Sequence, residues 1–217
     1  TGTMRVLEAA RATGRDPIVV VASSSSVYGA NPELPKHEAM TPMPVSPYAA
    51  SKLATEQYAL AWQHSYGLPT LAFRFFNVFG PRQAPGHAYA AVIPAFVSAA
   101  LAGEPLTVHG DGRQSRDFTY VGTVTEVILD AVRRRVSHPR PVNLAFGTRI
   151  TLLEVIELLE SLLGQTVQLD HVETRAGDVK HSQANNDTLR SLFPDVEPVS
   201  LTEGLAATIA WMRSYLA

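Results

Sequence analysis

Apolar residues form two alternating patterns along the chain. Short continuous runs rich in β-branched and aromatic residues predict buried parallel strands at residues 17–22 and 68–76. Segments with helix-favouring composition or helical spacing of apolar residues lie between such runs. The expected helices are 1–13, 47–66, 87–103, 123–136, 151–163 and 201–216, and the further expected strands are 106–109, 115–121, 141–145 and 167–172. This alternation of strands and helices predicts an α/β fold.

Capping residues mark the ends of two of these helices. Ser46 suits an N-cap, Pro47 suits the first helical position, and Gly67 suits the C-terminal end of the helix at 47–66. Thr151 and Glu154 have the spacing of a capping box, which predicts the start of the helix at 151–163.

Prolines mark two other features. Residues 31–47 contain five prolines without apolar periodicity, which predicts an ordered loop. Pro94 lies inside the expected helix at 87–103, where it should either kink the helix or begin its second part. Residues 77–85 are expected to form a loop at the carboxyl end of the second strand.

Tyr48 and Lys52 are candidate catalytic residues. They lie four residues apart at the start of a predicted helix, and therefore on one of its faces. A free tyrosine, with a pKa of about 10, is a poor base at neutral pH, but a nearby ammonium stabilises the phenolate. The pair could therefore accept a proton from a substrate. The alternative interpretation is a packed tyrosine beside a solvated lysine.

Four serines, residues 23–26, follow the first predicted strand. Ligands of parallel α/β sheets bind at the carboxyl ends of the strands, so these hydroxyl groups are candidate ligand contacts. The alternative interpretation is a serine-rich turn.

Composition narrows the classes of function. With 217 residues, of which 46% are hydrophobic, the chain can bury one large core or two small ones. A net charge of −2 without a basic stripe argues against nucleic-acid binding, and no apolar run is long enough to span a membrane. The absence of cysteine and of close histidine pairs predicts no metal site, and we expect a cytoplasmic protein.

Five motifs occur in a defined order along the chain. They are Ser-Ser-Ser-Ser-Val-Tyr-Gly at 23–29, Ser-Pro-Tyr-x-x-Ser-Lys at 46–52, Arg-Phe-Phe-Asn-Val-Phe-Gly-Pro-Arg-Gln at 74–83, Gly-Asp-Gly followed by Ser-Arg-Asp-Phe at 110–118, and Arg-Ala-Gly-Asp at 175–178. The chain thus resembles the extended short-chain dehydrogenase/reductases, a family of NAD-dependent epimerases and dehydratases that act on nucleotide sugars. Within it, the UDP-sugar 4-epimerases are the most similar.

The resemblance implies a fold and a domain organisation. The expected fold is a Rossmann-like parallel sheet with a small α+β substrate-binding lobe. Residues 1–85, with 123–147, would belong to the NAD-binding domain, and residues 86–122 and 148–217 mainly to the lobe. A glycine-rich dinucleotide-binding loop does not occur in this sequence, and the resemblance implies that this loop precedes it. The helices at 47–66 and 1–13 would form a homodimer interface.

The resemblance also implies a role for each motif residue. Near NAD, Tyr48 would be the base, Lys52 would hold the nicotinamide ribose, Ser24 would bond the reacting oxygen, and Ser23 and Phe76 would contact the cofactor. On a UDP-sugar, Asn77 would bond the sugar phosphate, Arg116 and Arg175 would bind the diphosphate, and Asp178 would accept hydrogen bonds from the uridine ribose. The strand with Thr107, Val108 and His109 would meet the uracil largely through its backbone, and Arg82 would add a further contact.

Two positions bear on the reaction and the substrate. Dehydratases of this family carry Thr-Asp-Glu where this chain has serines 24–26, and decarboxylases usually carry Glu at Ser26, so the resemblance disfavours both reactions. Ser182 matches a position beside the sugar C2 substituent, where a small residue leaves room for an N-acetyl group. UDP-glucuronate epimerisation, GDP- or dTDP-sugar chemistry, and a non-catalytic nucleotide-sugar-binding remnant remain alternatives.

Overall fold

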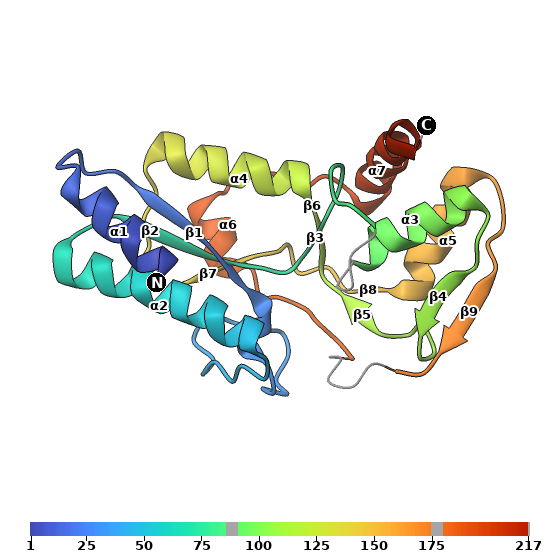
Figure 1. Cartoon of the computed structure of the whole chain (residues 1–217), viewed down its shortest axis with the longest axis horizontal. Helices are drawn as coiled ribbons and strands as arrows, with labels where there is room; N and C mark the ends of the chain where they lie inside the picture. Colours follow the sequence, from blue (N-terminus) through green and yellow to red (C-terminus); the bar gives the residue numbers. More distant parts are fainter. Residues whose placement is uncertain (86–90, 175–179, 217) are drawn as a thin grey trace. The chain divides into compact units, whose positions relative to one another are not determined.

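The computed structural model describes residues 1–85, 91–174 and 180–216, which form two compact units. The first unit contains Thr1–Phe76, Val124–Gly147 and Ala184–Glu197, and the second contains Asn77–Thr123, Thr148–Gln183 and Pro198–Ala217. Each unit is described by itself. The α/β fold predicted from the alternating pattern is confirmed (Figure 1).

Two stretches, residues 77–85 and 184–197, are placed in their units by contacts with segments that are distant in the sequence. Residues 77–85 fall in the second unit because β3 (Asn77–Phe79) pairs in parallel with β6 (Phe118–Tyr120). Residues 184–197 fall in the first unit because helix α6 (Asp187–Leu192) packs against β7 (Val142–Leu144). Pairing between distant segments, rather than position along the chain, therefore decides where each stretch belongs.

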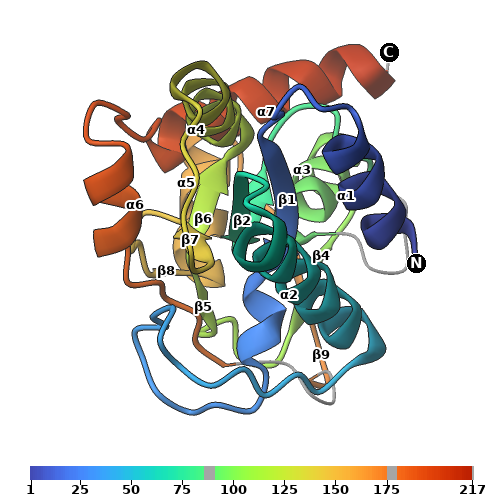
Figure 2. The same cartoon turned by 90° about the vertical axis from the view of Figure 1, so that its left-hand side faces the viewer.

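The first unit is built on a parallel sheet with the strand order β1-β2-β7. Figures 1 and 2 show α1 and α2 on one side of this sheet and α4 and α6 on the other. The elements not yet delimited are β1 (Val19–Ser24), β2 (Thr70–Phe75), α1 (Gly2–Ala12), α2 (Pro47–Tyr66), the 3-10 helix η1 (Ser25–Tyr28) and α4 (Val121–Arg134), of which the residues from Val124 onward belong to this unit.

The second unit combines short strand pairs with three helices. Besides β3 and β6, it contains the parallel pair β4 (Leu106–His109) and β9 (Leu169–Val172), the antiparallel pair β5 (Ser115–Arg116) and β8 (Ile150–Thr151), and the helices α3 (Val92–Ala102), α5 (Leu152–Leu163) and α7 (Leu201–Leu216). The three helices bury their apolar faces in one core around Phe96, Leu159 and Ile209. Burial of such faces is the main stabilising term for a small lobe.

The predicted helix caps of α2 are confirmed. The Ser46 hydroxyl accepts a hydrogen bond from the Ala49 amide at 3.1 Å, and Pro47 is the first helical residue. Gly67 ends the helix in the left-handed region at φ 69°, which glycine adopts without strain.

The other two local predictions also have clear outcomes. Thr151 and Glu154 form the capping box of α5, with the Glu154 amide donating to the Thr151 hydroxyl at 3.2 Å. Helix α3 begins at Val92, so Pro94 lies in its first turn, where it lacks only an amide that would have no helical partner. The described helix therefore has Pro94 in its first turn, and residues 87–90 of the expected helix lie outside the described residues.

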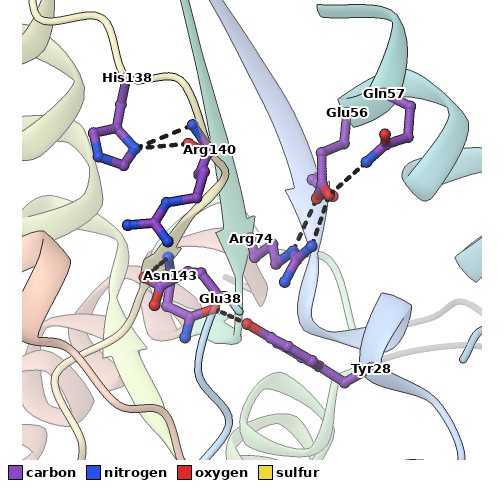
Figure 3. A network of polar contacts seen from close by, with 9 residues as sticks. Tyr28, Glu38, Glu56, Gln57, Arg74, His138, Arg140 and Asn143 are labelled. Carbon is purple, nitrogen blue, oxygen red and sulfur yellow. Dashed lines mark hydrogen bonds and ion pairs between the residues drawn. The ribbon is translucent and has the colours of Figure 1, made fainter. Parts of the chain in front are cut away.

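A buried polar network crosses the first unit, as Figure 3 shows. The Glu56 carboxylate accepts two hydrogen bonds from the Arg74 guanidinium, at 2.9 and 2.7 Å. The Arg74 guanidinium carbon lies 4.7 Å from the ring centroid of Tyr28, and the Tyr28 hydroxyl donates to the Asn143 side-chain oxygen at 2.6 Å. Burial raises the pKa of Tyr28, although the nearby Arg74 charge opposes this, so the phenol remains a donor.

Replacing Tyr28 with phenylalanine should lower the free energy of unfolding by about 1–3 kcal/mol, because the buried Asn143 oxygen loses its donor. Chemical denaturation of the Tyr28→Phe variant measures the change. The exposed Tyr215→Phe variant is the control, because its ring is 57% exposed. Equal unfolding free energies for both variants would show that the Tyr28 hydroxyl contributes no net stability.

Candidate active site

Ser24 lies at the carboxyl end of β1, where the strand passes into η1. Its hydroxyl oxygen accepts hydrogen bonds from the Ser26 amide at 3.2 Å and from the Ser26 hydroxyl at 2.9 Å. Because both bonds use the Ser24 oxygen as acceptor, the Ser24 proton can be donated to another oxygen. The serine run is therefore a helix cap that also presents a hydroxyl donor at the strand end.

Tyr48 and Lys52 occupy the first turns of α2, which packs against β1. The Tyr48 side chain is 57% exposed, so its hydroxyl is accessible to a ligand. The Lys52 ammonium lies 5.7 Å from the Tyr48 ring centroid and donates to the Ala22 carbonyl at 3.0 Å. The lysine is thus anchored to the end of β1 and is not freely solvated, contrary to the alternative interpretation.

The other two residues expected near NAD face the interior. The Ser23 side chain is buried, and its hydroxyl donates to Glu56 at 2.9 Å. Phe76 is 8% exposed and belongs to a buried cluster with Tyr28 and Ala145. The Ser23 hydroxyl is thus already engaged inside the unit, which favours a supporting role for that side chain over direct contact with a cofactor.

Arg116 and Asn77 are held by backbone groups of the second unit. The Arg116 guanidinium donates to the Ser115 carbonyl at 3.0 Å and to the Lys180 carbonyl at 3.3 Å. The Asn77 side chain and its own amide both donate to the Asp117 carbonyl, at 3.3 and 3.2 Å. These contacts fix the orientation of a guanidinium and an amide, the two groups expected to bind phosphate oxygens.

Strand β4 carries the three residues expected at the uracil. Thr107 is exposed, Val108 is buried in the core, and the His109 ring lies 3.0 Å from the Glu173 carbonyl. Val108 can therefore contact a ligand only through its backbone, as the resemblance implied for this strand. Arg82 is exposed and has a φ of 69°, an uncommon conformation for a residue other than glycine.

A polar cluster of His181, Ser115 and Arg149, which the sequence analysis did not predict, lies beside Ser182. The Ser182 amide donates to the Ser115 carbonyl at 3.0 Å, and the Ser115 hydroxyl lies 2.9 Å from Nδ1 of His181. Arg149 Nε donates to the same hydroxyl at 3.1 Å, so the Ser115 hydroxyl links His181 to Arg149. Partial burial, together with the charges of Arg149 and other nearby cations, lowers the pKa of His181, which keeps the ring neutral.

Arg175 and Asp178, expected at the diphosphate and the ribose, lie outside the described residues. Within the described part of the chain, no three histidine or acidic side chains gather closely enough to hold a metal ion. No helix there is long and apolar enough to cross a membrane.

A parallel sheet with polar side chains at its strand ends and a Tyr–Lys pair on the covering helix defines a Rossmann-like α/β protein. Residues 1–145 match the model of the NAD dependent epimerase/dehydratase family, and the chain belongs to this family. The resemblance inferred from the five motifs is thereby confirmed.

Three known proteins illustrate the similarity. The chain is 33% identical over 213 residues to a UDP-glucose 4-epimerase of Mycolicibacterium smegmatis, covering 98% of this chain and 67% of the relative. The structure of a UDP-N-acetylglucosamine 4-epimerase from Methanobrevibacter ruminantium M1, in complex with UDP-N-acetylmuramic acid, is 36% identical with a TM-score of 0.91, over 98% of this chain and 68% of that one. The structure of a UDP-glucuronic acid 4-epimerase from Bacillus cereus, in complex with UDP-glucuronic acid and NAD, is 27% identical with a TM-score of 0.85. The match covers 98% of this chain and 66% of that one. The chain thus spans about two thirds of the length of these relatives.

Proposed function

We propose that the full-length protein containing this sequence is an NAD-dependent UDP-hexose 4-epimerase. The observation that carries the proposal is the Tyr48–Lys52 pair. Lys52 is anchored to the carbonyl of Ala22, the residue that immediately precedes the serines at the end of β1. The Tyr48 oxygen is accessible beside a fixed ammonium, and a tyrosine oxygen placed in this way can exchange a proton with a sugar hydroxyl. Membership of the family supports the assignment.

NAD fits the described residues at its nicotinamide end, because Lys52 can bond a ribose hydroxyl from the carboxyl end of the sheet. When bound, NAD supplies the hydride acceptor and donor at C4 of the sugar. Tyr48 takes the C4 hydroxyl proton and later returns it to the 4-keto intermediate, while Ser24 donates to the reacting oxygen. Asn77, Arg82, Arg116, Arg175 and Asp178 would bind the UDP part, with the backbone of Thr107, Val108 and His109 at the uracil.

The test uses the full-length protein with UDP-glucose, UDP-N-acetylglucosamine and UDP-glucuronate in separate reactions. Chromatographic separation of the C4 epimers should show conversion of at least one of them, and NAD should be released when the protein is denatured. Bound UDP-sugar without NAD and without conversion would contradict the proposal and would favour the nucleotide-sugar-binding remnant.

Ser182 bears on which sugar is used. Its side chain is small and partly exposed, and its amide is bonded to Ser115, so it leaves space where a larger residue would not. We propose that N-acetylated UDP-hexoses are accepted. The Ser182→Tyr variant should lose most turnover of UDP-N-acetylglucosamine, by about tenfold or more, and keep that of UDP-glucose. Even one extra methylene in a pocket changes specificity by about 10–200-fold, and a tyrosine ring is much larger. A Ser182→Ala control should keep both activities. An unchanged ratio in Ser182→Tyr would contradict the proposal.

UDP-glucuronate is the second candidate substrate, and one observation favours it. The Bacillus cereus relative is a UDP-glucuronic acid 4-epimerase, and its structure in complex with UDP-glucuronic acid matches 98% of this chain with a TM-score of 0.85. The kcat/KM values of the three substrates, measured in the same experiment, distinguish this candidate from the first.

A homodimer is proposed through α1 and α2. These helices pack together in the first unit and still expose several large apolar side chains: Met4, Val6, Tyr58 and Tyr66. Sedimentation of the full-length protein should give the mass of two chains, and a monomer at micromolar concentration would contradict this arrangement.

A further inference from the structure

A buried carboxylate joins α2 to two strands of the sheet. Glu56 is 0% exposed and its partner Arg74 is 2% exposed. The Glu56 carboxylate accepts hydrogen bonds from the Ser23 hydroxyl of β1 at 2.9 Å and from Arg74 Nε and Nη2 of β2 at 2.9 and 2.7 Å. One side chain of α2 is therefore held by three directional bonds from two neighbouring strands, of which Figure 3 shows the two from Arg74.

Stability alone does not explain this ion pair. Removing two charges from water is costly, and apolar residues of similar volume are often as stable in the same position. In addition, Arg74 Nη1 is buried without a hydrogen-bond partner among the described residues, and its guanidinium lies over the Tyr28 ring. What an ion pair adds over apolar packing is direction, because its hydrogen bonds fix both the rotation and the height of the helix on the sheet.

The bonds of Glu56 lie next to the candidate catalytic residues. Lys52 and Glu56 are one helical turn apart on α2, and they bond to consecutive residues of β1: Lys52 to the Ala22 carbonyl at 3.0 Å and Glu56 to the Ser23 hydroxyl. The next residue of the strand is Ser24. The two cross-links thus join the first half of α2 to the strand end that presents the Ser24 hydroxyl.

We propose that Glu56 is a positioning residue for the reaction. Together with Arg74 and Ser23, it fixes α2 on β1 so that Tyr48 and Lys52 are held in register with Ser24. The catalytic part of this inference rests on the proposed function. It predicts that loss of the directional bonds lowers kcat even where the fold is kept, because displacements of about 1 Å can cost about 10²-fold in rate.

The test compares two variants of the full-length protein with the wild type. Glu56→Met/Arg74→Met replaces both charges with side chains of similar length, and Ser23→Ala removes only the bond from β1. In the double variant kcat should fall about tenfold or more, with Tm within a few degrees, NAD content retained and KM for the UDP-sugar nearly unchanged. Ser23→Ala should show a smaller fall in kcat at unchanged Tm. Asp130→Asn, which removes the negative charge of an exposed pair with Arg134 in the same unit, is the control and should change neither quantity.

A wild-type kcat in both variants would overturn the proposal. If the double variant does not fold, the kcat of Ser23→Ala alone decides whether the positioning role holds. If the wild type itself converts no UDP-sugar, the proposed function fails, and amide hydrogen exchange tests the positioning separately. The Ser26 amide, which donates to Ser24 Oγ, should then exchange faster in Ser23→Ala at unchanged global stability. Unchanged exchange at Ser26 would overturn the positioning role.

Discussion

Replacing Tyr48 with phenylalanine is expected to lower kcat for UDP-sugar epimerisation by about 10²–10⁴-fold, the range that a single acid–base group contributes. The ring and its contact with the Lys52 ammonium remain in the variant, while the proton-accepting oxygen is lost. Steady-state epimerisation by the full-length protein measures kcat, and release of nucleotide on denaturation measures the NAD content, which should equal that of the wild type.

Tyr66→Phe is a matched control for this experiment. Tyr66 lies on the last turn of the same helix and is 56% exposed, almost as much as Tyr48. Its loss of a hydroxyl should leave kcat unchanged. If Tyr48→Phe and Tyr66→Phe had equal, wild-type rates, Tyr48 would not be the base.

The largest expected effect on stability is that of Arg74→Met. Removing one partner of a buried ion pair leaves an uncompensated charge, and we expect a loss of about 3–5 kcal/mol in the free energy of unfolding. The remaining carboxylate of Glu56 is 0% exposed and would keep only the Ser23 hydroxyl and a long bond from the Gln57 amide, at 3.4 Å, without any positive partner. Denaturant unfolding, monitored by circular dichroism, measures the change.

The matched control is Arg134→Met. Arg134 forms an ion pair with Asp130 in which both side chains are partly exposed, and it also donates to the Leu192 carbonyl at 2.7 Å. Exposed pairs contribute about 0–1 kcal/mol and leave no buried charge behind, so the control should lose much less stability than Arg74→Met. The double variant Glu56→Met/Arg74→Met should be more stable than Arg74→Met alone. If Glu56→Met/Arg74→Met were less stable than Arg74→Met, the loss of stability in Arg74→Met would not come from the unpaired Glu56 carboxylate.

The sequence contains one signal for the buried pair. Arg74 is a charged residue inside the otherwise apolar run Leu-Ala-Phe-Arg-Phe-Phe, and a charge in a buried strand requires a buried counter-charge. Glu56 lies one helical turn after Lys52, on the same face of α2. The pairing of the two could not be chosen from sequence, because several other carboxylates were equally available.

The sequence alone determined those features that depend on residues only three or four positions apart. The start and end of α2, the capping box of α5 and the common face of Tyr48 and Lys52 all depend on hydrogen bonds or helix geometry across three or four residues. The family, too, could be read from five motifs in a fixed order along the chain, and the family model that matches residues 1–145 confirms it.

The tertiary structure decided the features that depend on pairing between distant segments. Residues 77–79 were expected in a loop but form β3, because β6, about forty residues later, provides the backbone partners. The contacts of Ser23 with Glu56, and of Ser115 with His181 and Arg149, likewise join residues far apart in the sequence. Local propensity carries no information on such partners, since a hydrogen-bonding group in a short segment can be satisfied by many others, and only the packed chain selects one.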